Sequence, residues 1–120
     1  LPHPIPPRLA EMIAERFRVL AEPMRLRLLD HLREGEATVG ELADVLGTTQ
    51  QNVSKHLKLL VDNGVVARTR RGTASYCSIA DPLVFDLCES ICGGIQSQSR
   101  EVAELFEVST PSTTRTTRSK

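Results

Sequence analysis

The sequence lacks the features expected of an exported or membrane-inserted protein. Its N-terminal residues contain no apolar signal-peptide core, and no uninterrupted apolar run approaches the length that spans a membrane. The three cysteines are an odd set, too sparse for a disulfide scaffold. We therefore expect a cytoplasmic chain with free thiols and no membrane partner.

The sequence also lacks the common signatures of catalysis. It contains no glycine-rich phosphate loop, no nucleophile elbow and no His-Glu-x-x-His motif. The remaining reactive candidates are the thiols, and Cys88 and Cys92 lie in a predicted helix near Asp86 and Glu89. Because neighbouring carboxylates do not activate a thiol, we predict that the chain is not an enzyme.

The net charge is zero, but basic and acidic side chains are segregated along the chain. Residues 48–72 carry five basic side chains and one acidic, a balance of +4, whereas residues 81–107 carry one basic and six acidic, a balance of −5. Since the local field steers a polyanion, the first of these segments is suited to nucleic acid despite the neutral total.

Two short helices joined by a tight turn are predicted between residues 38 and 64. Thr38 and Glu41 form a capping-box pattern, and Gly47 suits the left-handed position that ends a helix. Thr48 or Thr49 can cap the second helix. The apolar face of this second helix comprises Val53, Leu57, Leu60 and Val61.

The opposite face of the second helix suits contact with DNA. No Asp or Glu occurs from residue 50 to residue 61. Gln and Asn can read adenine edges, Ser can bond a base or a phosphate, and Lys neutralises phosphate. For His56, a DNA-contact or helix-packing role is favoured over metal ligation. The predicted DNA-contact residues of this segment are Thr49, Gln50, Gln51, Asn52, Ser54, Lys55, His56 and Lys58.

A basic β-ribbon follows this helix directly. Residues 65–71 and 74–79 are β-rich runs joined through Gly72 and Thr73. Arginines near such a tip can meet phosphates or enter a minor groove. The ribbon therefore adds Arg68, Arg70 and Arg71 to the predicted DNA-contact residues.

The rest of the chain is predicted to be helical between two irregular ends. We expect an extended proline-rich arm over residues 1–7, a helix from about Leu9 to Ala21 and another from Pro23 that Gly35 ends. Asp81 can cap a long final helix that has Pro82 at its first position, and Gly93-Gly94 would weaken or bend that helix. Residues 108–120 are polar and of low complexity, which predicts disorder.

The order of these parts predicts a mainly α fold with a small β-hairpin (α+β), a winged helix-turn-helix with additional N- and C-terminal helices. Over residues 8–107 the sequence resembles the ArsR/SmtB family of bacterial repressors. The resemblance is carried by LAEPMRLRLL (20–29), ELA (41–43), QNVSKHLKLL (51–60), GVV (64–66) and RGT (71–73). It implies a homodimer with an interface formed by residues 9–20 and 83–106, bound to double-stranded DNA at imperfect inverted repeats. Apolar faces on both segments fit that role.

An effector site is harder to predict from the sequence. The cysteine pair of arsenic- and cadmium-type members and the Asp/His set of zinc-type members are both missing at the corresponding positions. Cys88 and Cys92, one helical turn apart, could hold a thiophilic metal or metalloid with Cys77 or a partner's thiols. They could instead sense oxidation, or simply pack as small apolar side chains.

The sequence thus predicts a dimeric, DNA-binding transcriptional repressor that a thiophilic ion or thiol oxidation could release. Two alternatives stay open, a repressor without an effector and a winged-helix module that binds protein rather than DNA.

Overall fold

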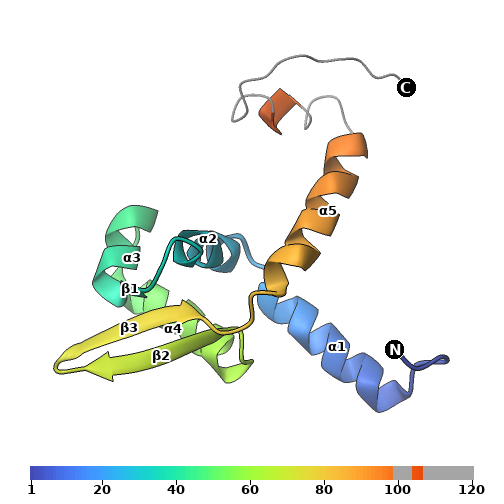
Figure 1. Ribbon diagram of the computed structural model, residues 1–120, viewed down its shortest axis with the longest axis horizontal. Helices are drawn as coiled ribbons and strands as arrows, with labels where there is room; N and C mark the ends of the chain where they lie inside the picture. Colours follow the sequence, from blue (N-terminus) through green and yellow to red (C-terminus); the bar gives the residue numbers. More distant parts are fainter. Residues whose placement is uncertain (99–103, 107–120) are drawn as a thin grey trace. The chain divides into compact units, whose positions relative to one another are not determined.

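The computed structural model describes residues 1–98 and 104–106 (Figure 1). The chain divides into two compact units, Leu1–Pro82 and a second unit that begins at Leu83. The first unit contains the helices α1 (Pro7–Leu20), α2 (Pro23–Leu32), α3 (Val39–Leu46) and α4 (Gln50–Asp62). It also contains the strands β1 (Ala37–Thr38), β2 (Val66–Arg71) and β3 (Ala74–Ile79), and the second unit contains α5 (Val84–Gln98).

The local signals in the sequence form the predicted helix ends. Thr38 and Glu41 make both hydrogen bonds of a capping box at the start of α3, and Gly47 ends this helix in the left-handed conformation with φ of 68°. Thr49, rather than Thr48, caps α4. The predicted helix-turn-helix is therefore confirmed, with α4 in the position of a recognition helix.

The sheet has one strand more than the predicted hairpin. All three strands are antiparallel in the order β1-β3-β2, with Ala37 opposite Cys77 and Arg68 also opposite Cys77 on the other side. The two residues of β1 are too short a run to produce a recognisable strand pattern in the sequence. This strand ties the segment that precedes α3 to the hairpin.

The core of the first unit lies between α2, α3, α4 and the base of the sheet. Leu26 on α2 is 40% exposed and does not belong to this core. The fully buried side chains are Leu28, Leu29, Leu42, Val53, Leu57, Leu60, Val65 and Cys77. One face of α4 therefore anchors this helix in the core.

Helices α1 and α5 both begin at residues other than those predicted. Helix α1 begins at Pro7, so the arm is one residue shorter than predicted. Helix α5 begins at Val84, not at Asp81 or Pro82. The backbone N–H groups of Ala80 and Asp81 donate to the Val65 carbonyl at 2.9 and 3.3 Å, which keeps this segment on the sheet and delays the helix.

The second unit contains the predicted final helix up to Gln98. Helix α5 runs through Gly93 and Gly94 to Gln98, and residues 104–106 are also helical. Residues 99–103 of the predicted interface segment 83–106 lie outside the described residues. The tail over residues 108–120, for which disorder is predicted, also lies outside them. None of the helices described over residues 1–98 and 104–106 is long and apolar enough to cross a membrane.

Truncation of Leu57 to Ala should strongly destabilise the first unit. Leu57 is completely buried on α4, so its loss leaves a cavity and should cost about 2–5 kcal/mol of unfolding free energy in urea denaturation. Leu59→Ala, two residues away at a position that is 40% exposed, is the matched control and should cost less than about 1 kcal/mol. Equal losses in the two variants would contradict the assignment of the buried face.

Candidate nucleic-acid interface

The turn between α3 and α4 is held by a short chain of side-chain hydrogen bonds. Thr49 Oγ1 accepts from the backbone N–H of Asn52 at 3.1 Å, and Asn52 Nδ2 donates to Thr48 Oγ1 at 3.1 Å. No acidic residue lies in the first turn of α4, so its positive end stays uncompensated. These bonds orient the start of α4, where backbone N–H groups can meet a phosphate.

The outermost stripe of α4 is polar and basic. Gln51, Lys55 and Lys58 are exposed and recur at helical spacing. Lys58 Nζ is 3.1 Å from Asp62 Oδ2 in an exposed pair at the end of the helix. Such a pair is weak, which leaves Lys58 able to exchange its carboxylate for a phosphate.

The other predicted contacts on α4 are less freely exposed. Asn52 and Ser54 are half-buried, and the amide of Asn52 is already engaged with Thr48. Gln50 is exposed, and its side chain lies close to Gly40 near the start of α3. A Cβ added to Gly40 would be 3.5 Å from Gln50 Nε2. The structure therefore brings Thr49, Gln50 and Gln51 together as the most open polar group at the start of the helix.

His56 does not lie on the exposed stripe with the other predicted contacts. Its side chain is buried, with 8% of the residue exposed, and its Nδ1 is 3.1 Å from Nη1 of Arg25 on α2. Burial thus places it in the core and favours helix packing, the second of the two roles expected from the sequence. We remove it from the set of DNA-contact residues for that reason.

Arg25 joins three elements around this histidine. Its backbone N–H donates to Glu22 Oε1 at 3.1 Å, which caps α2, and its Nε donates to the carbonyl of Val19 at the end of α1. Because a guanidinium only donates, His56 Nδ1 must accept in a hydrogen bond with Arg25, which requires the tautomer that carries its proton on Nε2. Glu22 Oε1, 4.0 Å from Nδ1, is too distant for a hydrogen bond.

The two faces of the hairpin carry different arginines. Residues directly opposite across the ladder share a face, so Arg68 lies with Cys77 and Arg70 with Ser75, while Arg71 lies on the reverse face with Ala74. Arg68 Nε donates to Ser75 Oγ at 3.1 Å. Arg70 is exposed and, within the described part of the chain, makes no side-chain hydrogen bond or ion pair.

Arg71 is engaged by a residue that the sequence analysis missed. Its Nη2 and Nη1 lie 2.7 Å from Oε1 and Oε2 of Glu36, and its guanidinium carbon lies 4.6 Å from the centre of the Tyr76 ring. The hydrogen bond from Arg71 holds the pKa of the Glu36 carboxyl below its usual value, and the same bond raises the pKa of Arg71. Both groups are therefore charged at neutral pH.

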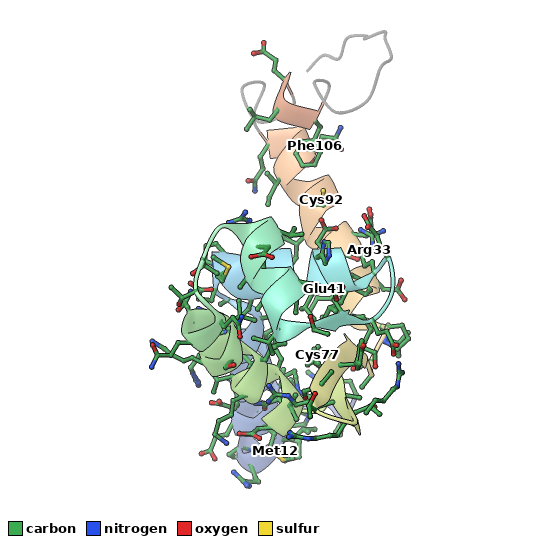
Figure 2. All side chains as sticks on the ribbon, turned by 90° about the vertical axis from the view of Figure 1, so that its left-hand side faces the viewer. Met12, Arg33, Glu41, Cys77, Cys92 and Phe106 are labelled. Atoms are coloured by element: carbon green, nitrogen blue, oxygen red, sulfur yellow. The ribbon has the colours of Figure 1, made fainter. Side chains whose placement is uncertain are left out.

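The three cysteines fall into two different settings. Cys77 is fully buried in β3, and burial raises the pKa of its thiol, which disfavours the thiolate that a metal needs (Figure 2). Cys88 and Cys92 are half-buried on α5, one turn apart. Over the residues described, no three His, Cys, Asp or Glu side chains come together as a ligand set. The Cys88–Cys92 pair stays a prediction, with two ligands from this chain.

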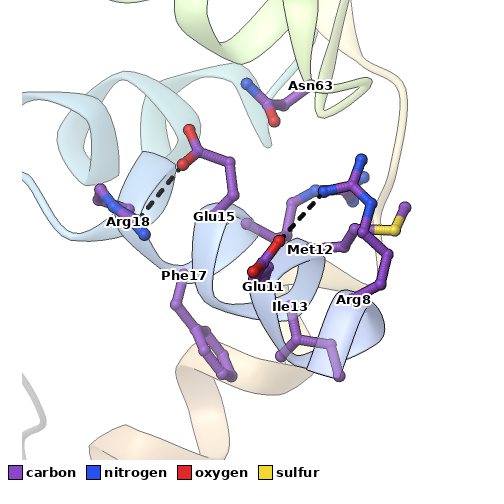
Figure 3. Close-up of a pocket in the computed structure, with 9 residues that line it drawn as sticks. Arg8, Glu11, Met12, Ile13, Glu15, Phe17, Arg18 and Asn63 are labelled. Atoms are coloured by element: carbon purple, nitrogen blue, oxygen red, sulfur yellow. Dashed lines mark hydrogen bonds and ion pairs between the residues drawn. The ribbon is translucent and has the colours of Figure 1, made fainter. Parts of the chain in front are cut away.

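An open hollow of about 770 Å³ lies along α1. Figure 3 shows the α1 side chains that line it and, from the end of α4, Asn63. Met12 and Phe17 are 56% and 50% exposed on this helix, which also carries the ion pairs Arg8–Glu11 and Glu15–Arg18, each at 3.3 Å. Apolar side chains this exposed on one helix are typical of an interface.

Replacement of His56 tests the assignment of its ring as a hydrogen-bond acceptor. His56→Ala leaves Arg25 without this partner and should lower the unfolding free energy in urea by about 1–3 kcal/mol. His56→Asn places an amide oxygen near the position of Nδ1 and should retain part of that stability. An alanine variant as stable as the native chain, or no difference between the two variants, would contradict the acceptor role.

Comparison with known proteins places this geometry in a family. Residues 20–69 match a family described as a helix-turn-helix domain. The chain is 45% identical over 71 residues to the probable mercury resistance operon repressor of Streptomyces lividans, a match that covers 59% of this chain and 57% of that protein. It is 32% identical over 80 residues to the arsenical resistance operon repressor of Bacillus subtilis, with 65% and 76% covered.

The fold has a similar solved counterpart. A homodimeric winged helix-turn-helix DNA-binding domain from Mycobacterium bovis, described as a possible ArsR-family transcriptional regulator, aligns with a TM-score of 0.68 at 27% identity. The alignment covers 82% of this chain and 97% of that one. The chain spans less than two thirds of the Streptomyces protein but most of the Bacillus one. On the shared sequence and the shared arrangement of α3, α4 and hairpin, the chain belongs to the ArsR/SmtB family of winged helix-turn-helix regulators.

Proposed function

We propose that the protein is a cytoplasmic transcriptional repressor that binds an inverted-repeat operator as a homodimer. The observation that carries the proposal is the exposed stripe of α4, free of carboxylates until Asp62, in the same compact unit as a hairpin with three arginines. A helix of this kind fits a major groove, and a basic ribbon beside it fits the phosphates. The relatives are named as repressors of resistance operons, which supports the same assignment.

The exposed residues divide into base readers and phosphate binders. Gln50 and Gln51, with the free acceptor of Asn52 and with Ser54, have the donors and acceptors that read base edges. The phosphate binders are Thr49, Lys55, Lys58, Arg68, Arg70 and Arg71. This division assigns no catalytic step to the chain.

The dimer interface is proposed to include the apolar sides of α1 and α5. Met12 and Phe17 on α1 and Ile91 and Ile95 on α5 are all at least 40% exposed in the single chain. A second copy that covers them removes apolar surface from water, and a two-fold dimer presents two α4 helices to two half-sites. The Mycobacterium bovis domain is a homodimer, which supports this arrangement.

The effector is proposed to be a thiophilic metal or metalloid at Cys88 and Cys92. Mercury and arsenic appear in the names of the two relatives, and soft thiolates are the ligands that such ions prefer. Two thiols on one turn supply part of a ligand set, which the same pair on a second copy can complete. Each thiol would lose its proton when its sulfur binds the ion.

Fluorescence anisotropy on the upstream DNA of its own gene tests the proposed function. The native protein should bind this fragment more tightly than a scrambled fragment of equal length, with an affinity that falls steeply with salt. Gln51→Ala should cost about 1–3 kcal/mol on the upstream fragment and little on the scrambled one. A loss of the same size on both fragments would remove Gln51 from the base readers. Failure to bind any genomic fragment would favour a protein-binding module.

The same assay tests the thiol pair. Arsenite, cadmium or mercuric ion added to the reduced complex should release the DNA, and Cys88→Ser with Cys92→Ser should abolish the release while binding without ion is kept. Cys77→Ala is the control and should leave the release unchanged, since Cys77 is buried in β3. Indifference to all three ions would contradict the metal assignment, and release by the thiol oxidant diamide would then identify oxidation as the signal.

A further inference from the structure

Glu36 occupies the end of the Arg71 guanidinium that its two terminal nitrogens form. Both terminal nitrogens of Arg71 are at 2.7 Å from the two carboxylate oxygens of Glu36, a fork-to-fork arrangement. A phosphate uses the same two parallel donors of a guanidinium. A phosphate that binds Arg71 in this way must therefore displace Glu36.

The position of Glu36 follows from the short strand β1. Thr38 is opposite Tyr76 and Ala37 is opposite Cys77, so Glu36, one residue before β1, falls by alternation on the same face as Tyr76. Arg71 lies on that face too, with its guanidinium over the Tyr76 ring. The pairing of β1 with β3 thus brings a carboxylate from a distant loop to the basic hairpin.

Arg70 provides an internal comparison. It is the neighbour of Arg71 on β2, lies on the other face with Ser75, and has no side-chain partner among the described residues. The two adjacent arginines therefore differ in one respect that matters for a polyanion, because one is open and the other is neutralised. Arg71 and Glu36 remain 55% and 40% exposed, so their pair can open without disturbing the core.

We propose that Glu36 limits the DNA affinity of this protein by competing with the DNA phosphates for Arg71. The inference rests on the proposed DNA-binding function and adds a residue that tunes it. When the hairpin meets DNA, Arg71 exchanges the carboxylate for a phosphate, and the released Glu36 stands as a negative charge beside the backbone. Both effects oppose binding, and both act on any sequence, because phosphates carry no base information.

The opposite role for Glu36 predicts the opposite sign. If Glu36 only oriented Arg71 toward DNA, its removal would weaken binding. The geometry favours competition, because the carboxylate takes the two terminal nitrogens that a phosphate bound end-on would use, and the Tyr76 ring already supports the guanidinium.

The experiment compares Glu36→Gln with Glu34→Gln by anisotropy on the upstream and scrambled fragments across a salt series. Glu34 is an exposed carboxylate in the same loop, so its replacement makes the same charge change without touching Arg71. Glu36→Gln should bind both fragments about 3- to 10-fold more tightly, with a salt slope steeper by up to about 0.9, the value of one added phosphate contact. Glu34→Gln should change affinity less than about twofold, as expected of an exposed charge that solvent screens and that makes no pair with Arg71.

Two further variants separate release of Arg71 from a general charge effect. In an Arg71→Gln background, Glu36→Gln should give clearly less tightening than in the native background, because only the repulsion by its own negative charge is then removed. Arg70→Gln should cost more affinity than Arg71→Gln in the native background. Unchanged or weaker binding by Glu36→Gln, or equal effects of the two glutamate variants, would overturn the inference while the native protein still binds DNA. Absence of binding by the native protein itself would overturn the proposed function and this inference together.

Discussion

The structure depends on α4 burying one side completely while it keeps the other side open. Val53, Leu57 and Leu60 are inaccessible to solvent, and they set the rotation of the helix about its axis. The stripe of Gln51, Lys55 and Lys58 faces outward as a consequence. Packing in the core thus determines which side chains of α4 face outward. If α4 could rotate about its axis, it would present a different set of side chains to the groove.

A polar joint extends this constraint beyond the apolar contacts. The guanidinium of Arg25 links Val19 at the end of α1 to His56 on α4, and the backbone N–H of Arg25 completes the cap of α2. Because α1 also carries the exposed Met12 and Phe17, the helix with an uncovered apolar face is bonded to the recognition helix through one guanidinium. The positions of α1 and α4 therefore depend on each other.

The sequence predicted those features that local signals determine. The Thr38–Glu41 capping box, Gly47 and the hairpin turn each depend on residues within a few positions, and the structure confirms them. The missed contacts join residues far apart in the chain: His56 is 31 residues from Arg25, and Arg71 is 35 from Glu36. No periodicity marks such pairs, because they arise when tertiary packing brings two elements together. The two-residue β1 was missed for the same reason, since its conformation is set by its partner β3.

The order of the strands places the arginines of β2 on an edge of the sheet, where they also affect self-association of the protein. In the order β1-β3-β2, strand β2 is an edge of the sheet and exposes its outer backbone groups from Ala67 to Arg71. An exposed edge is a template on which another chain can add a strand. Positive charges at Arg68 and Arg70 repel a like edge of a second molecule, so the side chains that suit phosphate also protect the protein against self-association through β-pairing.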